Sequence, residues 1–307
     1  MASDPYQPLI ERFGAALSRD ESMARRTVAR LGGPADALLM ARNADDLADA
    51  VTLACQREIP WIVIGSGANI LVADAGIRGL VIVNQAKDIR FEEGGRVVAE
   101  SGASLSTLAR RCMNQGLAGL AWAVNVPGTV GGAVINNAGA HDSDMAAIVR
   151  WVEVFSLEDR PHVELWGISQ MRYSYRTSVL KGNRGCYIAL AATLALDPGH
   201  DPGELNARAD EFVAHRKRTQ PPGASLGSIF KNPPGDFAGR LIEAAGLKGT
   251  TAGQAQISPV HANFIINLGD CSAADYRALI EIARDTVRVK FGVALELEIE
   301  LIGEWDK

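Results

Sequence analysis

Two glycine-rich segments constrain this chain more than any other feature of its sequence. Residues 126–140 read Val-Pro-Gly-Thr-Val-Gly-Gly-Ala-Val-Ile-Asn-Asn-Ala-Gly-Ala, and residues 64–72 read Ile-Gly-Ser-Gly-Ala-Asn-Ile-Leu-Val. Glycine reaches backbone conformations closed to other residues and lacks the Cβ that would keep a ligand away. Successive N–H groups in such turns form concave anion sites. Either segment alone fits a tight turn between buried strands, but the pair favours a ligand with a polyphosphate and a ring system.

The length and composition of the chain narrow its class. With 307 residues it is long for one hydrophobic core, so we expect two or three domains. A composition of 47% hydrophobic and 22% charged residues is typical of soluble globular proteins. The net charge of −5 favours neither nucleic acid nor an anionic membrane as a partner. No apolar run approaches the ~20 residues of a membrane span, and residues 1–6 do not resemble a signal peptide.

The cysteines and histidines show no spacing typical of metal ligands. The cysteines are far apart in the sequence, which indicates reduced thiols in a cytoplasmic protein. We therefore expect a cytoplasmic location and no metal site. The cysteines are Cys55, Cys112, Cys186 and Cys271, and the histidines interpreted as structural or exposed are His141, His162, His200 and His215.

Capping residues and hydrophobic periodicity predict a mixed succession of helices and strands in the first 200 residues. Asn43 and Ser104 are placed to cap helices, and Gly116 is placed to end the second of these. We expect helices over residues 8–18, 44–57 and 105–115, and strands over residues 61–64, 80–83, 97–100, 151–155 and 187–190.

A Pro/Gly-rich stretch at residues 197–203 reads as a linker. Beyond it, the pattern predicts helices over residues 204–218, 237–245 and 273–291, and strands over residues 263–267 and 295–301. The last of these strands alternates strictly between apolar residues and glutamates. We interpret the chain as an α+β protein with domains at residues 1–84, 85–197 and 198–307.

Several common site motifs are absent. Gly65-Ser66-Gly67 lacks the third glycine of the Rossmann fingerprint, because position 70 is isoleucine. The chain has no Gly-Lys dipeptide, which excludes a P-loop, and no His-Glu-x-x-His motif. Residues 223–227 match the Gly-x-Ser-x-Gly pattern of a hydrolase nucleophile elbow, but that motif needs a strand before it and a helix after it. Gln-Pro-Pro precedes it here and Ile-Phe follows soon after, which disfavours a hydrolase.

Six motifs in a fixed order nevertheless resemble one enzyme family, the UDP-N-acetylenolpyruvoylglucosamine reductases. The resemblance runs from about Thr27 to Gly303 and implies a flavoprotein fold of the vanillyl-alcohol-oxidase type, with two FAD subdomains and a C-terminal α+β substrate domain. The motifs are Gly65-Ser66-Gly67-Ala68-Asn69, residues 127–133, Tyr175-Arg176-x-Ser178, residues 227–233, the Ala238–Gly249 segment and Leu295-Glu296-x-Glu298. Ala68 departs from the serine common in the family, and the short interval between Arg176 and Gln220 indicates the compact type without the tyrosine-loop insertion.

The resemblance implies non-covalent FAD as cofactor and NADPH as hydride donor; the sequence itself holds no separate signature for the NADPH phosphate. It also implies that both glycine segments bind the FAD, with backbone N–H groups on its pyrophosphate. The implied cofactor residues are Gly65, Ser66, Gly67, Ala68, Asn69, Ile70, Pro127, Gly128, Thr129, Gly131, Gly132 and Ala133.

The same resemblance implies three catalytic residues. Arg176 suits the substrate carboxylate, because its planar fork matches that group. Ser228 is implied as proton donor and Glu298 as a protonated hydrogen-bond donor, a state that burial favours. Taken alone, each fits a plainer role: a surface ion pair for Arg176, a turn residue for Ser228 and a solvated strand face for Glu298.

Weaker expectations concern the surroundings of these residues. Tyr175, Lys231 and Asn232 are candidate substrate contacts, with Tyr175 equally able to belong to the core. His261 and Asn263 are expected only to support the site.

The activity implied is reduction of UDP-N-acetylglucosamine enolpyruvate to UDP-N-acetylmuramate in peptidoglycan precursor synthesis, by a monomer. Two alternatives stay open. One is an alcohol oxidase or dehydrogenase of the same flavin fold, which would not need Ser228, Arg176 and Glu298 together. The other is a non-catalytic regulator that binds a nucleotide sugar without turnover.

Overall fold

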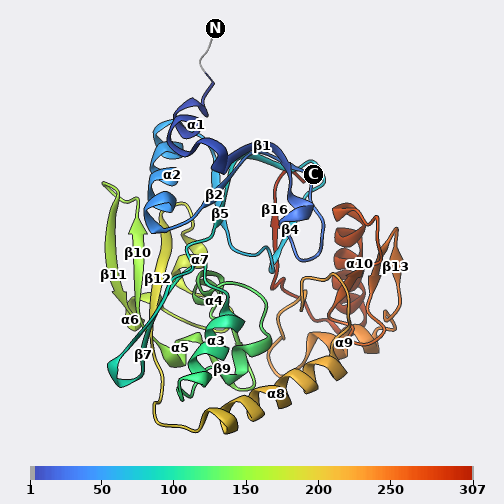
Figure 1. The fold of residues 1–307 in the computed structure, drawn as a ribbon. Helices are drawn as coiled ribbons and strands as arrows, with labels where there is room; N and C mark the ends of the chain where they lie inside the picture. Colours follow the sequence, from blue (N-terminus) through green and yellow to red (C-terminus); the bar gives the residue numbers. More distant parts are fainter. Residues whose placement is uncertain (1–3, 306–307) are drawn as a thin grey trace. The chain divides into compact units, whose positions relative to one another are not determined.

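The computed structural model describes residues 4–305 (Figure 1), and these divide into two compact units. Unit 1 comprises the described residues up to Ser18, Leu38–Gly65 and Val81–His215; unit 2 comprises Arg19–Ala37, Ser66–Leu80 and the described residues from Arg216 on. The division passes through three strands of a four-stranded sheet with the order β1-β2-β5-β3. These strands are β1 (Leu17–Ser22), β2 (Pro34–Ala41), β5 (Ile77–Asn84) and β3 (Trp61–Ile64).

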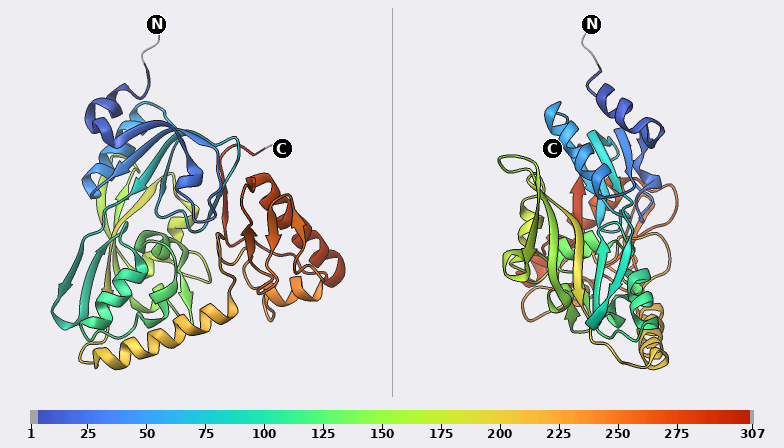
Figure 2. Two further views of the ribbon diagram at one scale, coloured as in Figure 1. Left: turned by 45° about the vertical axis from the view of Figure 1, so that its right-hand side comes forward. Right: turned by 60° about the vertical axis from the view of Figure 1, so that its left-hand side comes forward.

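Unit 1 is built on a five-stranded antiparallel sheet with the order β11-β10-β12-β7-β6, seen from two further sides in Figure 2. Its strands are β6 (Ile89–Glu92), β7 (Arg96–Glu100), β10 (Val149–Ser156), β11 (His162–Gly167) and β12 (Tyr187–Ala195). Alternate residues of β7 and β10, such as Val97 and Val152, are fully buried in one apolar core with Leu108. The strands expected over residues 97–100, 151–155 and 187–190 are confirmed.

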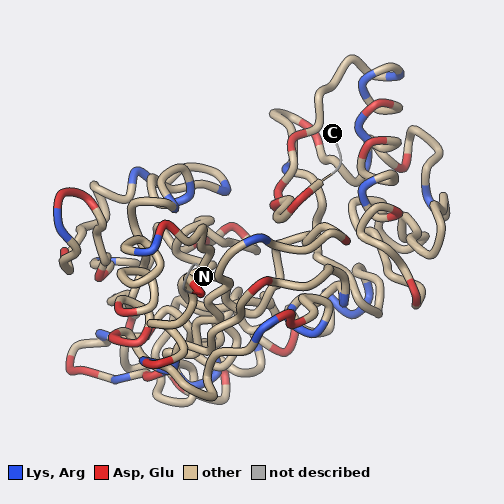
Figure 3. Tube along the Cα trace, turned by 90° about the horizontal axis from the view of Figure 1, so that it is seen from above, with Lys and Arg blue, Asp and Glu red and all other residues tan. Residues whose placement is uncertain are grey.

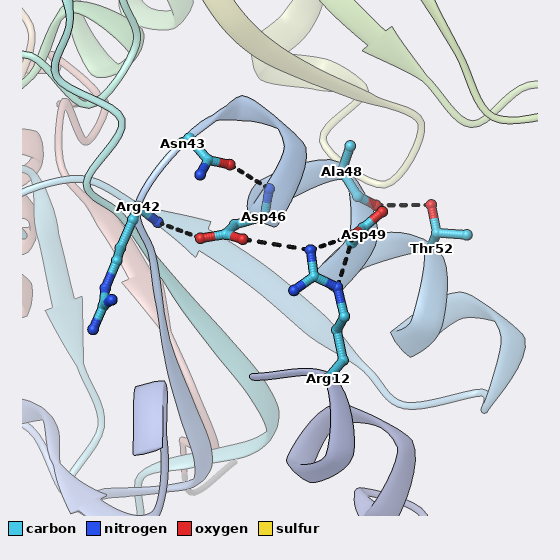
Figure 4. A network of polar contacts seen from close by, with 7 residues as sticks. All are labelled: Arg12, Arg42, Asn43, Asp46, Ala48, Asp49 and Thr52. Atoms are coloured by element: carbon cyan, nitrogen blue, oxygen red, sulfur yellow. Dashed lines mark hydrogen bonds and ion pairs between the residues drawn. The ribbon is translucent and has the colours of Figure 1, made fainter. Parts of the chain in front are cut away.

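Helix α2 (Ala44–Gln56) begins as its capping signal predicts. The Asn43 side chain accepts a hydrogen bond from the backbone N–H of Asp46 at 2.8 Å. Asp46 and Asp49 then meet Arg12 at 3.7 and 2.8 Å, which ties α1 (Gln7–Phe13) to the first turns of α2 (Figure 4). Helix α1 is shorter than expected, because Gly14 has a φ of +51° and the chain continues into β1. Two carboxylates in the first turns also suit the positive end of the α2 dipole.

The second glycine-rich segment enters a helix, so the plainer alternative, a tight turn between buried strands, is wrong for it. Helix α4 (Val130–Asn136) starts at Thr129, whose hydroxyl accepts a hydrogen bond from the N–H of Gly132 at 3.4 Å. It packs against β12 and ends at Asn137, which has a φ of +44°. Helix α3 (Leu105–Asn114), capped by Ser104 as predicted, precedes it. The remaining short elements of unit 1 are β8 (Gly139–Ala140), β9 (Ser143–Asp144), α5 (Met145–Ile148), α6 (Ile168–Met171) and α7 (Val179–Gly182).

In unit 2, helix α10 (Ala273–Phe291) packs against a three-stranded sheet of β13 (Thr251–Ala252), β14 (Ala255–Ile257) and β15 (Ile265–Asn267). Ser272 caps α10 and Gly292 ends it, as predicted. The Tyr276 side chain is fully buried, and its hydroxyl donates to the carbonyl of Ile265 at 2.7 Å. Acidic and basic residues alternate along α10 (Figure 3), and Glu281–Arg284 and Asp285–Arg288 form ion pairs within it.

Two short strands join distant parts of the sequence within unit 2. Strand β4 (Ile70–Val72) pairs in parallel with β16 (Glu300–Ile302). The strand expected over residues 295–301 is therefore wrong for most of its length, since only Glu300 and Leu301 of that range lie in β16. Helix α9 (Ala238–Ala244) completes unit 2, and α8 (Pro202–Thr219) begins in unit 1 and ends in unit 2. The proposed three-domain division at residues 84 and 197 stays a prediction. Among the described helices, none is both long and apolar enough to cross a membrane.

Candidate active site

Gly65 of the first glycine-rich segment contacts the second glycine-rich segment within unit 1. A Cβ built on Gly65 would stand 2.4 Å from the Thr129 hydroxyl oxygen, so the Thr129 side chain can pack against the backbone of residue 65 only because that residue is glycine. Gly128, next to Thr129, has a φ of +131° and open space where a Cβ would stand. The structure therefore brings Gly65 and Thr129 together, although the sequence separates them by some 60 positions.

Some N–H groups of the second segment are already bonded within the protein. Val130 donates to the carbonyl of Ala103 at 2.8 Å, and Gly131 donates to that of Ser101 at 2.7 Å. A Cβ on Gly131 would come within 2.9 Å of the Ser101 Cβ. Glycine at position 131 therefore serves close packing against β7 and its following turn. We expected this segment to offer a run of N–H groups to a pyrophosphate. Because the N–H groups of Val130 and Gly131 are bonded within the protein, those of Gly128 and Thr129 are the remaining candidates at its start.

The first segment passes into unit 2 at Ser66, where Asn69 has a clear structural role. Its side-chain amide donates to the carbonyl of Glu298 at 3.1 Å, and its own carbonyl accepts from the N–H of Glu300 at 2.9 Å. A Cβ on Gly67 would meet the Arg26 carbonyl at 2.0 Å, so this glycine permits a close backbone contact. Asn69, predicted to contact the cofactor, thus holds the backbone of a predicted catalytic residue.

Ser228 and Glu298 lie on neighbouring backbone segments of unit 2. The N–H of Glu298 donates to the carbonyl of Ile229 at 2.8 Å, and Phe230 pairs with Leu297 in an antiparallel bridge. Ser228 itself is half-buried, as is Glu298. Glu298 therefore bonds directly to the residue after Ser228, although 70 positions separate Ser228 and Glu298 in the sequence.

The candidate substrate contacts of unit 2 already have partners in the structure. Lys231 forms an ion pair with Glu296 at 3.3 Å, on the same pair of segments. The Asn232 side chain accepts from the N–H of Ala238 at 3.1 Å and so caps α9. Both residues remain candidates for substrate binding, but Asn232 has a sufficient structural reason to be asparagine.

Arg176 lies in unit 1 at the tip of a two-residue hairpin. Ser174 and Thr177 exchange backbone hydrogen bonds, both of 3.2 Å, around Tyr175 and Arg176. Arg176 has a φ of +56°, a conformation that costs a non-glycine residue free energy and is often found at functional sites. Its guanidinium lies 5.5 Å from the ring centre of Tyr175, which is 54% exposed.

Two buried side chains, those of Asn137 and Ser178, anchor this hairpin to the end of α4. Neither residue was predicted to have a role. The Asn137 amide donates to the Ser174 carbonyl at 3.2 Å and to the Asp144 carboxylate at 3.0 Å, and its oxygen accepts from the N–H of Ala146 at 3.0 Å. The Ser178 hydroxyl donates to the carbonyl of Ile135 at 2.6 Å. Asparagine is common at the left-handed end of a helix, but no helix was predicted over residues 130–136, so no signal in the sequence indicated Asn137.

Comparison with known proteins now places the chain. Residues 219–302 match the family model described as UDP-N-acetylenolpyruvoylglucosamine reductase, C-terminal domain, and residues 35–159 match the FAD binding domain. A UDP-N-acetylenolpyruvoylglucosamine reductase of Rubrobacter xylanophilus is 44% identical over 96% of this chain and 98% of its own length. This chain belongs to the UDP-N-acetylenolpyruvoylglucosamine reductase family. The reductase of Chloroflexus aggregans is 41% identical over 95% of this chain and 99% of its own.

A solved structure of the family supports the same assignment. The reductase of Thermus caldophilus has a TM-score of 0.79 and 33% identity, over 93% of this chain and 98% of that one. The resemblance inferred from six motifs is therefore confirmed, as is the flavoprotein fold. The FAD binding domain covers every predicted cofactor residue, and the reductase C-terminal domain covers Ser228, Lys231, Asn232 and Glu298. Arg176 lies between the two matched ranges.

The hydrolase interpretation of residues 223–227 is excluded by the local fold. Ala224 forms an isolated bridge with Asn267, and the described chain has no helix between Thr219 and Ala238. Ser225 therefore does not stand on a strand-to-helix elbow.

Burial raises the pKa of the Cys112 thiol to about 12, so this cysteine stays protonated and unreactive.

Proposed function

We propose that this protein is an NADPH-dependent flavin reductase that converts UDP-N-acetylglucosamine enolpyruvate to UDP-N-acetylmuramate. The observation that carries the proposal is the near full-length match to reductases of this family. The substrate is an enol ether conjugated to a carboxylate. Its reduction needs a hydride at the terminal carbon, stabilisation of the negative charge that then spreads onto the carboxylate, and a proton at the adjacent carbon.

FAD fits the residues present. Gly128 has a φ of +131° and open space where a Cβ would stand, so a flat, phosphate-bearing cofactor would have close access to the backbone there. Residues 65–70 and 127–133 would hold the FAD non-covalently. When bound, the flavin carries hydride from NADPH to the enolpyruvyl group.

Arg176 would bind the substrate carboxylate. A guanidinium donates two parallel hydrogen bonds to a carboxylate, and these strengthen as negative charge develops during hydride transfer. The hairpin tip holds Arg176 in a left-handed conformation that Asn137 and Ser178 help to maintain. A fixed cation stabilises the developing charge without having to reorganise first.

Ser228 would donate the proton, and Glu298 would act beside it as a hydrogen-bond donor in its protonated form. A serine hydroxyl is a weak acid, so its role depends on accurate placement against the strongly basic enolate. The backbone bond between Glu298 and Ile229, the neighbour of Ser228, supplies such placement. Tyr175, Lys231 and Asn232 are proposed contacts for the rest of the substrate.

The proposal includes a cytoplasmic monomer that neither inserts into a membrane nor binds nucleic acid. It rests on the composition and charge of the sequence, and on free thiols at Cys55, Cys112, Cys186 and Cys271. Size-exclusion chromatography with light scattering tests the monomer, and cell fractionation tests the location.

An absorbance experiment tests the reaction. The purified protein is expected to be yellow, to bleach under anaerobic NADPH and to recolour when the UDP-enolpyruvyl sugar is added. Recolouring with oxygen but not with the sugar would instead indicate an oxidase or dehydrogenase of the same fold. Binding of the sugar to a protein that NADPH cannot bleach would favour the non-catalytic regulator.

The variant Ser228→Ala tests the assignment of the proton donor. Because the proton is needed only after hydride transfer to the sugar begins, we expect sugar-dependent recolouring to slow by roughly 10²-fold or more. Bleaching by NADPH should keep its wild-type rate. An equal loss in both half-reactions would contradict this role of Ser228.

A further inference from the structure

The buried side chain of Asn263 forms hydrogen bonds with the backbone segment that carries Ser228. It is 3% exposed, and its amide nitrogen donates to the carbonyl of Phe230 at 2.8 Å. Its amide oxygen accepts from the N–H of the same residue at 2.9 Å. The backbone carbonyl of Asn263 accepts a third bond, from the N–H of Ile229 at 2.9 Å. One residue thus satisfies three of the four backbone polar groups of Ile229 and Phe230, the two residues immediately after Ser228.

The opposite edge of the same segment is bonded to the chain around Glu298. Ile229 accepts from the N–H of Glu298 at 2.8 Å, and Lys231 donates to the carbonyl of Glu296 at 2.9 Å. Residues 229–231 therefore run between Asn263 on one edge and residues 296–298 on the other, like a strand inside a sheet. The Asn263 side chain takes the place of a neighbouring strand, because it bonds both the N–H and the carbonyl of Phe230.

On the other side of Ser228 the chain has more freedom. Gly227 has a φ of +77° and open space around its missing Cβ. The next bond back along the chain joins the N–H of Leu226 to the Tyr276 hydroxyl at 3.3 Å. The place of the Ser228 hydroxyl is therefore set chiefly by the bonds at Ile229 and Phe230.

We propose that Asn263 is a positioning residue for the proton transfer, acting through the backbone of Ile229 and Phe230 on Ser228. This inference rests on the proposed function. An amide is required because it both donates and accepts; a carboxylate of the same shape keeps the bond from the Phe230 N–H but loses the donor to the Phe230 carbonyl. A buried group left without its partner costs about 1–3 kcal/mol, enough to let the segment shift. A misplacement of about 1 Å can slow a reaction by about 10²-fold.

The test compares Asn263→Ala and Asn263→Asp with Asn267→Ala in the FAD-loaded enzyme. Asn267 is a matched control: it lies in the same unit, and its amide donates to the Ala29 carbonyl at 2.9 Å, away from Ser228. Stopped-flow absorbance follows bleaching by NADPH and recolouring by the sugar separately. We expect both Asn263 variants to recolour about 10- to 100-fold more slowly, with unchanged bleaching and an enlarged solvent deuterium isotope effect on recolouring. The control should recolour at the wild-type rate.

A double variant separates positioning from general structural damage. In the Ser228→Ala background, adding Asn263→Asp should cause almost no further loss, because the proton donor it positions is already gone. A full additional loss there, or an equal slowing of bleaching and recolouring, would overturn the inference. If Asn263→Ala fails to fold, the isosteric Asn263→Asp still decides the question. Failure of the proposed function is recognised separately, since the wild-type enzyme would then not recolour with the sugar.

Discussion

The Arg176 hairpin of unit 1 and the Ser228–Glu298 segments of unit 2 hold their proposed catalytic residues by different means. Arg176 is half-buried at a hairpin tip, and its hairpin is tied to the end of α4 through the side chains of Asn137 and Ser178. Ser228 and Glu298 lie on neighbouring segments joined by backbone hydrogen bonds, and buried Asn263 bonds the opposite edge of the Ser228 segment.

The difference follows from the task of each residue. A guanidinium on a long side chain can find a carboxylate from a fixed turn, so the hairpin needs only to be anchored at its base. A serine hydroxyl has almost no reach, so its backbone itself must be fixed. We therefore expect unit 1 to tolerate small changes of Arg176 geometry better than unit 2 tolerates displacement of Ser228.

Replacing Arg176 should give the largest effect in this comparison. Arg176→Ala removes the charge that stabilises the carboxylate, and we expect sugar-dependent recolouring to slow by about 10³-fold, since such electrostatic groups contribute about 10²–10³ or more. Arg176→Lys keeps a cation but loses the planar fork, so it should recover only part of that loss. Stopped-flow absorbance measures both. Bleaching by NADPH should be unaffected, and a lysine variant as fast as wild type would show that charge alone suffices.

Breaking the anchor of the hairpin should have a smaller effect. Asn137→Ala removes hydrogen bonds to Ser174, Asp144 and Ala146, and we expect recolouring to slow by about tenfold, because about 1–3 kcal/mol of anchoring is lost from a buried site. In the Arg176→Ala background the same change should add little. Asn206→Ala is the control, since Asn206 joins α8 to Asn114 in the same unit. A tenfold loss that persists without Arg176 would mean that Asn137 acts on something else.

Local signals in the sequence predicted much of the fold. Asn43, Ser104 and Ser272 each cap a helix where expected, because a side-chain oxygen three residues before a free N–H is a purely local interaction. The start of α4 was missed because glycine is typical of turns and ligand-binding loops and disfavours a helix interior. In the structure, Gly131 is small in order to pack against Ser101, a contact that no local pattern reveals.

Non-local pairing explains the other failure. The alternation of residues 295–301 correctly predicts that Leu295 and Ile299 are buried, yet the segment is not one strand. Leu297 pairs with Phe230, whereas Glu300 pairs with Ile70 of β4. The chain changes partner between them and bends there. The same change of partner lets Asn69 reach the Glu298 carbonyl, so the sequence indicated the candidate site residues but not what holds them.

The smallest expected effect is a pH dependence of stability in unit 2, caused by His261, which accepts a hydrogen bond from Asn263. The His261 ring nitrogen Nδ1 accepts from the N–H of Asn263 at 3.2 Å, which requires that nitrogen to be unprotonated. Burial lowers the pKa of His261 below its ordinary value of about 6.5, and nearby Lys248 lowers it further, while Glu243 opposes the shift. As the pH falls through about 6.5, the unfolded chain takes up this proton before the folded one. The free energy of unfolding should therefore decrease from pH 7 toward pH 5.

Urea unfolding at these pH values measures how steeply the free energy of unfolding changes with pH, and His261→Gln should reduce this slope, because an amide does not titrate. His200→Gln, at an exposed histidine paired with Asp197, should leave the His261 contribution in place. Equal slopes in the wild type and His261→Gln would show that protonation of His261 does not weaken the support of the Ser228 segment.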